Sequence, residues 1–247
     1  MDPYTLSDTL EALADVETAR RQRKQAQPLR GIRGTPLAEV ARIAAAAQQE
    51  SPARLPEHAA ELGELFAAAW EDGLVAIGLL AATVPDSPHD ALDVGLDWLG
   101  RIDDVATADA LGWLVLGGGC LASGEPLSSL GKPTHVAAKR AVVMAAMAAL
   151  PEPLEGASAA ALRSKLSQRR VAWVESPQSE VIAEHLNGWL RDEMPPVRKA
   201  VRRVLRAWTK WDPAAVTAWG DAVRGGLPKM LRAEVERARR RAARMTS

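Results

Sequence analysis

The chain is poor in the residues that favour β-strands and in the residue that forms disulfides. Among its 247 residues there are one cysteine, one phenylalanine and one tyrosine. The single Cys120 excludes an intramolecular disulfide and a cysteine-rich metal cluster. Alanine, leucine and valine dominate the hydrophobic residues, and isoleucine is scarce. Aromatic and β-branched residues favour strands, whereas alanine, leucine, arginine and glutamate favour helices. The composition therefore predicts an all-α fold.

Long apolar runs and metal-ligand spacings are also missing. No apolar run reaches the ~18 residues of a membrane span; Leu111–Ala122 is short and is interrupted by Gly117, Gly118 and Gly119. We expect those glycines to form a loop that ends a helix. The N-terminus has no apolar signal core, and the four histidines are scattered. We therefore expect a soluble, cytoplasmic monomer with no membrane contact, no metal and no cofactor.

The net charge of the chain is zero, but its basic and acidic residues are unevenly distributed. The chain has 31 basic and 31 acidic residues, of which 22 basic and 11 acidic residues fall between Lys132 and the end. This half carries a net charge of +11 and residues 1–131 carry −11. Clustered lysine and arginine attract anionic partners such as nucleic acid. The alternative is that these charges only solvate exposed helix faces.

Helix-start signals recur along the chain. Five pairs place a capping residue before a proline: Thr35-Pro36, Ser51-Pro52, Ser87-Pro88, Ser176-Pro177 and Asp212-Pro213. The apolar spacing predicts helices near residues 6–14, 16–26, 36–48, 55–70, 72–83, 88–100, 104–117, 133–149, 158–173, 177–191, 196–210, 213–224 and 228–244.

A coarse repeat joins these helices. Similar helices start about 30–35 residues apart, or at twice that interval, which is typical of solenoids built from helix pairs. We predict one domain over residues 1–247, a solenoid of stacked antiparallel helix pairs, with a basic tail at about 232–247. We expect its basic run Arg232–Arg244 to fray. A compact irregular bundle is the alternative.

One helix, Val197–Lys210, separates apolar and cationic residues cleanly. Its apolar residues repeat at helical spacing, and five cations occupy the other face: Lys199, Arg202, Arg203, Arg206 and Lys210. No acid stands between them, so their mutual repulsion favours an anionic ligand such as phosphate. The alternative is again a solvated face.

Two further features could carry chemistry. Lys139 and Arg140 lie in a second basic helix. Asp109 lies within the apolar helix Val105–Leu116, where a carboxylate is costly to bury unless it is hydrogen-bonded or used. It could stabilise a developing cation or position a water. Alternatively, it is satisfied locally near the helix start.

Five short segments occur in an order that a known family shares. They are Gly31-Ile32-Arg33-Gly34-Thr35-Pro36, Glu64 to Trp70 followed by Leu74–Ala82, Trp98 followed by Ile102–Leu111, Lys139-Arg140-Ala141-Val142, and Lys199 to Arg206 followed by Asp212-Pro213. Together they resemble the AlkD-like DNA alkylation repair family, and the resemblance covers most of the chain.

The resemblance implies a solenoid of HEAT-like repeats whose concave basic face holds duplex DNA. It also implies a DNA glycosylase that excises N3- or N7-alkylated purines without flipping the base. Asp109 would supply the carboxylate that stabilises the oxocarbenium-like sugar. Arg140, or Lys139 if the alignment slips by one residue, would hold a phosphate.

Two aromatic positions of the family are not matched. Val105 stands where a tryptophan precedes the aspartate, and Arg203 stands where a second tryptophan follows K-A-x-x. Trp113, one turn after Asp109, could replace one wall of the cleft. Arg203 in place of an aromatic residue would add phosphate affinity.

Three functional hypotheses follow. The first is a DNA-binding, metal-free N-glycosylase for alkylated purines. The second is an inactive member that binds damaged or branched DNA structurally. The third is a protein–protein scaffold in which the acidic segment 43–131 contacts a basic partner.

Overall fold

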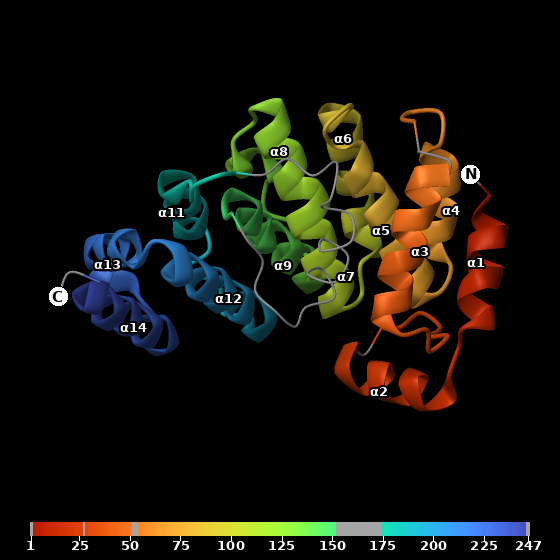
Figure 1. Ribbon diagram of the computed structural model, residues 1–247. Coiled ribbons are helices and arrows are strands. Elements are labelled where there is room, and N and C mark those ends of the chain that lie inside the picture. Colours follow the sequence, from red (N-terminus) through yellow and green to blue (C-terminus); the bar gives the residue numbers. More distant parts are fainter. Residues whose placement is uncertain (1, 27, 51–53, 152–173, 246–247) are drawn as a thin grey trace.

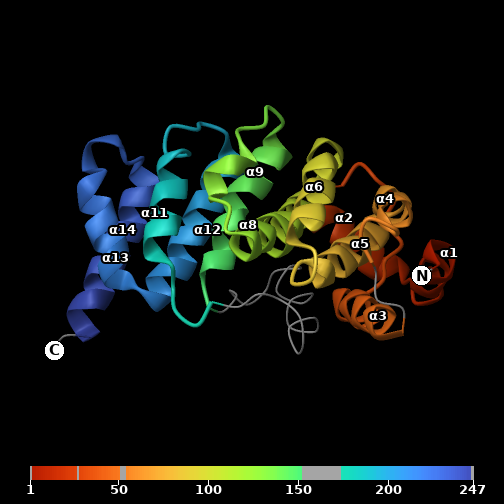
Figure 2. The ribbon, with the colours of Figure 1, turned by 90° about the horizontal axis from the view of Figure 1, so that it is seen from above.

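The computed structural model describes residues 2–26, 28–50, 54–151 and 174–245, and every regular element within those ranges is a helix. The all-α prediction is confirmed for these residues, whereas the predicted helix 158–173 lies outside them. The helices follow one another along the long axis of the molecule, and the two termini lie at opposite ends (Figure 1, Figure 2).

The N-terminal third packs around one central helix. Its helices are α1 (Pro3–Ala12), α2 (Val16–Ala26), α3 (Leu37–Glu50), α4 (Ala59–Ala67), α5 (Trp70–Thr83) and α6 (Pro88–Trp98), followed by the 3-10 turn η1 (Leu99–Arg101). All 14 residues of α5 are buried, because α3, α4 and α6 pack around it. After Glu71 and Asp72 in its first turn, α5 is almost entirely apolar, as expected for a core helix.

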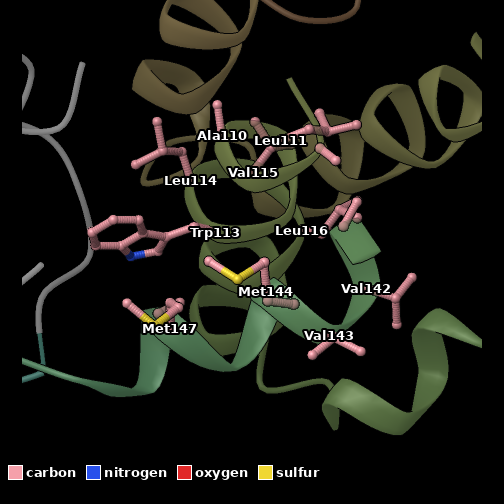
Figure 3. Packing of buried hydrophobic residues seen from close by; sticks show 14 of the residues in the cluster. Ala110, Leu111, Trp113, Leu114, Val115, Leu116, Val142, Val143, Met144 and Met147 are labelled. Carbon is pink, nitrogen blue, oxygen red and sulfur yellow. The ribbon is translucent and has the colours of Figure 1, made fainter. Parts of the chain in front are cut away.

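The centre of the molecule is built on a helix that continues through three segments. These are α7 (Val105–Ala110), the π-helical segment η2 (Leu111–Gly117) and α8 (Gly118–Ser123). It packs against α9 (Val136–Met144) and the 3-10 segment η4 (Ala145–Ala149), which follow η3 (Leu127–Leu130). Figure 3 shows Leu114, Leu116 and Val115 of this helix beside Val142, Val143 and Met144.

The three glycines do not end this helix, so that prediction is wrong. The helix ends at Ser123, where Gly124 adopts φ 78°, a left-handed conformation that suits glycine. The 19-residue stretch Val105–Ser123 is long and apolar enough to cross a membrane by composition, but 78% of its most apolar window is buried inside the protein. It therefore serves as a core helix in this fold.

The C-terminal part consists of α11 (Ser179–Asn187), α12 (Pro195–Trp211), α13 (Pro213–Ala222), the turn η5 (Arg224–Gly226) and α14 (Lys229–Met245). Helix α12 packs against α9, α13 and α14. The predicted fraying of residues 232–244 is wrong, because α14 is a 17-residue helix whose Leu231, Val235 and Ala238 are buried. Its apolar stripe anchors an otherwise basic helix.

The capping signals succeed where the side chain is free to reach the helix. Asp212 accepts a hydrogen bond from the backbone N–H of Ala215, and α13 begins at Pro213 as predicted. Helix α6 also begins at Pro88 as the proline predicts, although the Ser87 side chain makes no capping hydrogen bond. Thr35 instead donates its hydroxyl to the Leu10 carbonyl, so it ties α1 to the chain before α3 rather than capping.

Candidate nucleic-acid interface

Asp109 lies on α7 and is almost fully buried, with 3% of its surface exposed. Arg140 of α9 holds both carboxylate oxygens: Nε lies 2.7 Å from Oδ1 and Nη2 lies 2.9 Å from Oδ2. Arg140 is itself 4% exposed and donates through Nη1 to the Pro196 carbonyl of α12. Asp109 is therefore satisfied by distant helices, whereas Asp104 caps the start of α7.

A second arginine reaches the same carboxylate. Arg203 Nη1 of α12 donates to Asp109 Oδ2 over 2.9 Å, and its side chain is 27% exposed. Residues 109, 140 and 203 thus converge from α7, α9 and α12, and the two guanidiniums leave the cluster with a net charge of +1. A buried ion pair in a paired, two-pronged geometry is among the stronger charge-assisted contacts.

Close packing of two helices brings Asp109 to Arg140. A Cβ placed on Gly112 would lie 2.0 Å from the Ala141 carbonyl oxygen, and a Cβ on Gly117 would lie 2.2 Å from the Ala145 carbonyl oxygen. Only glycine permits this approach of η2 to α9 and η4. Since Asp109 and Gly112 are one turn apart, the contact sets the position of the carboxylate.

A cavity of about 220 Å³ lies beside this cluster. Its lining includes Val105, which is 41% exposed, together with Arg140 and Pro196. Two carboxylates also line it, Asp103 and Asp104, which the sequence analysis did not single out. The position of Asp104 directly before an apolar helix was the signal that could have identified it as an N-cap.

The Asp104 carboxyl is held in place by several donors. It accepts hydrogen bonds from the backbone of Ala106 and Thr107 and, over 3.1 Å, from the Trp70 indole. Burial raises the pKa of Asp104, although the hydrogen bonds from Thr107 and Trp70 oppose this. Because its donors fix it, Asp104 shapes the cavity wall and caps α7.

Trp113 does not form a wall of this cavity. It is 3% exposed and belongs to the hydrophobic core, and Figure 3 shows its ring near Met147 and Met144. The expectation that it replaces a cleft aromatic is therefore wrong. The π-helical turns of η2, which begin at Leu111, change the angular spacing after Asp109, so a residue four positions later need not share its face.

The cations of α12 are met by an acid that the helix itself lacks. Glu234 of α14 is 1% exposed, and its Oε1 accepts from Arg202 Nε over 2.6 Å and from Arg206 Nε over 2.9 Å. Its Oε2 accepts from Arg237 over 2.9 Å. Burial raises the pKa of Glu234, but hydrogen bonds from Arg202 and Arg206 outweigh it, so the pKa lies below its usual value.

The remaining predicted cations are more open. Lys139 pairs with Asp192 over 2.8 Å, with its side chain 24% exposed. Lys199 and Lys210 are exposed on α12, and the Lys210 ammonium lies 5.6 Å from the centre of the Trp211 ring. The predicted cations therefore form separate groups. Arg140 and Arg203 contact Asp109, whereas Arg202 and Arg206 contact Glu234. Lys199 and Lys210 face outward.

A family model described as "DNA alkylation repair enzyme" matches residues 6–234. The chain belongs to this DNA alkylation repair family. No curated protein and no solved structure gives a match to it. The resemblance read from the five short segments is thus confirmed over nearly the whole chain.

In this family member, the positions that depart from the family pattern have distinct structural roles. Val105 opens onto the cavity as a small apolar surface, whereas Arg203 binds Asp109. Among the described residues, no group of three or more histidine, cysteine, aspartate or glutamate side chains could hold a metal ion. The chemistry that this site offers is carboxylate and guanidinium chemistry.

Proposed function

We propose that this protein binds duplex DNA as a monomer and acts as an N-glycosylase that releases N3- or N7-alkylated purines without flipping the base. The HEAT-like solenoid expected from the sequence, one domain with a concave basic face, is part of the proposal. Its support is the order of the helices along the molecule and the packing of α12 against α9 and α14 (Figure 1). Neither a metal nor a cofactor enters the reaction.

The chemistry needs little more than charge stabilisation. An alkylated purine is cationic, so the glycosidic bond breaks with its electron pair leaving on the base, which becomes neutral. The sugar acquires oxocarbenium character, water adds to C1′, and one proton is lost to solvent. A fixed carboxylate stabilises the cationic sugar and can orient the attacking water.

The observation that carries this proposal is the Asp109 carboxylate fixed by Arg140. A two-point ion pair holds the carboxylate in one orientation, so it needs no reorganisation during the reaction. The adjoining cavity is lined by Arg140, which also has N–H groups for a phosphate. In this proposal Asp109 stabilises the cationic sugar and Arg140 holds a phosphate.

Arg203 must leave Asp109 before the carboxylate can face a nucleotide. Its guanidinium occupies Oδ2 together with Arg140, and Asp109 has little exposed surface of its own. A DNA phosphate is the natural replacement partner, because it offers the same two-pronged geometry to arginine. The half-buried side chain of Arg203 reaches solvent and can turn towards it.

The test is base release from a duplex that carries one N7-methylguanine. We expect the wild type to release the base and Asp109→Asn to lose at least ~100-fold in rate, as when an electrostatic stabiliser is removed. Asp90→Asn, which removes an exposed carboxylate of α6, is the matched control and should not change the rate. Equal rates for wild type and Asp109→Asn would exclude the assigned role.

A second function has two specific observations in its favour. The Arg203–Asp109 ion pair occupies the carboxylate, and Val105 offers no aromatic face to a sugar. Both features suit a member that binds damaged or branched DNA structurally. Salt-sensitive DNA binding without base release would establish this function, and failure to bind any duplex at low salt would favour a protein scaffold instead.

A further inference from the structure

A second basic surface lies between α12 and α14, away from the Asp109 cluster. It is an open groove of about 530 Å³. Its lining residues are Arg206, Thr209, Lys210, Arg237, Arg240, Arg241 and Arg244. Six of these seven residues are cations and none is an acid. We call this surface the α12–α14 groove.

One face of α14 supplies four of the cations. Arg237, Arg240, Arg241 and Arg244 follow the i, i+3, i+4, i+7 spacing of a single helix face. Arg240, Arg241 and Arg244 are exposed and form no ion pair with another residue that the structure describes. Like charges at this spacing repel one another, so the face favours an anionic ligand.

The other arginines of α14 are used elsewhere. Arg239 pairs with Asp221 and Glu236 over 2.6 Å each, and Arg232 donates to the Leu227 carbonyl over 2.9 Å. Neither of them lines the groove. The helix therefore separates its arginines into a structural set and a set that faces the open groove.

Glu234 fixes the edge of the groove without neutralising it. This buried carboxylate holds Arg206 through Nε and Arg237 through Nη1. Each guanidinium has five N–H donors, so most donors of both residues remain for a ligand. Among the described residues, Arg240, Arg241 and Arg244 remain unpaired beside this carboxylate and keep the surface positive.

The dimensions of the groove suit one strand of a nucleic acid. The four α14 arginines span seven residues, about 10 Å at 1.5 Å per residue. The backbone of one DNA strand winds around the duplex axis, so its consecutive phosphates lie farther apart than the axial rise of about 3.4 Å, and this length covers about two phosphates. Arg206 is one turn beyond Arg203 on α12, so the groove starts one helical turn from the Asp109 cluster and shares no residue with it.

We propose that the α12–α14 groove binds the sugar–phosphate backbone of one DNA strand beside the nucleotide that faces Asp109. The proposal rests on the proposed function for its choice of duplex DNA. It assigns the main backbone contact to α14, whereas the sequence placed this contact on α12 and α9. Planar guanidiniums bind phosphate oxygens in pairs, which suits the arginine-rich lining.

The test compares two double variants of α14 that remove the same charge. Arg240→Gln/Arg244→Gln alters the groove, and Arg232→Gln/Arg239→Gln alters the two arginines outside it. The affinity for an undamaged duplex is measured as a function of salt. Each phosphate contact contributes about 0.9 to the slope of log affinity against log salt. The groove variant should therefore lower the slope by about 2, with roughly a tenfold or greater loss of affinity at ~0.1 M salt.

The control variant should leave the slope nearly unchanged. Equal losses in both variants would overturn the proposal, because they would show a diffuse charge effect, and so would no loss in either. Binding to vesicles that contain anionic lipid is measured in parallel. A groove variant that loses vesicle binding and keeps its DNA slope would also overturn the proposal, in favour of a membrane surface.

Two further measurements distinguish a loss of groove contacts from misfolding and from a failure of the glycosylase proposal. Arg240→Lys/Arg244→Lys preserves the charge and should keep the salt slope, which excludes misfolding as the cause. A slope change without base release from N7-methylguanine would support the groove and contradict the glycosylase. Base release with an unchanged slope in the groove variant would contradict the groove and support the glycosylase.

Discussion

At the scale of single residues, the site depends on how one carboxylate is shared by two arginines. Asp109 is held by Arg140 in a buried, two-pronged contact and by Arg203 in a more exposed, single contact. The two arginines differ in how easily they can leave the Asp109 carboxylate. Arg140 is enclosed and also bonds to the Pro196 carbonyl, whereas Arg203 can turn to solvent. Arg203 is therefore the partner that DNA can displace.

Removing the Arg203 side chain should leave one oxygen of the Asp109 carboxylate free to face the nucleotide. A hydrogen bond to a charged group contributes about 1.5–3 kcal/mol, so Arg203→Ala should raise the rate of base release by roughly tenfold or more at saturating protein. Arg202→Ala, which breaks a contact with Glu234 instead, is the control. A slower release by Arg203→Ala than by the wild type would show that Arg203 assists the reaction.

The residues 109, 140 and 203 could be selected from the sequence, but their pairing could not. Asp109 was identified because a carboxylate in an apolar helix needs a partner, and Arg203 because it interrupts a family pattern. Their contact joins positions 94 residues apart. No local periodicity reports such a contact, so the sequence could not show that the carboxylate is occupied.

At the scale of helices, the site depends on close approach between η2 and α9. The spacing predicted α12 at 196–210 and it is found at Pro195–Trp211, because its apolar stripe and basic face are unambiguous. The central helix was predicted to stop at 117 and runs to Ser123. Glycine usually ends a helix, but in this helix its lack of a side chain allows another backbone to approach.

Two glycines of this helix should respond oppositely to alanine. A Cβ at Gly112 would meet the Ala141 backbone at 2.0 Å, so Gly112→Ala should destabilise the protein by about 3 kcal/mol. At Gly118 the nearest atom is a Val84 methyl at 3.7 Å, so Gly118→Ala should be neutral or stabilise by up to ~1 kcal/mol. Urea unfolding of both variants checks this pair. A similar stability for both would contradict the described packing.

The Glu234 cluster should make the junction of α12 and α14 sensitive to acid. The folded-state pKa of Glu234 lies below its unfolded value. Its stabilising contribution is therefore present above pH ~4.5 and is lost as the pH falls through the folded-state pKa. Glu234→Gln should reduce the free energy of unfolding at pH 7, and its difference from the wild type should shrink at low pH.

Glu236→Gln is the matched control for this experiment. Glu236 lies on the same helix and pairs with Arg239, but its side chain is 51% exposed. Exposed ion pairs contribute little to stability, about 0–1 kcal/mol. Chemical unfolding between pH 7 and pH 3 should separate the two variants. If the free energies of unfolding of Glu234→Gln and the wild type differed by a constant amount over that range, Glu234 would not have the assigned ion-pairing role.

At the scale of the whole molecule, the uneven charge follows the direction of the helix array. The sequence predicted a basic C-terminal half, and the α12–α14 groove lies in this half. Figure 2 shows α12 and α14 at the C-terminal end of the molecule. The sequence did not show that Arg202 and Arg206 pair with Glu234, because Glu234 lies 32 residues from Arg202 and 28 from Arg206. Family membership came from the order of short motifs and could be read directly.

The most direct test of the central claim is the rate of base release from a duplex with one N7-methylguanine, measured at saturating protein. We expect the wild type to release the base well above the spontaneous rate, and Asp109→Asn to lose that release while it still binds DNA. A wild type that binds the same duplex tightly and releases no base above the spontaneous rate would contradict it, and would leave Asp109 as a structural partner of Arg140 and Arg203.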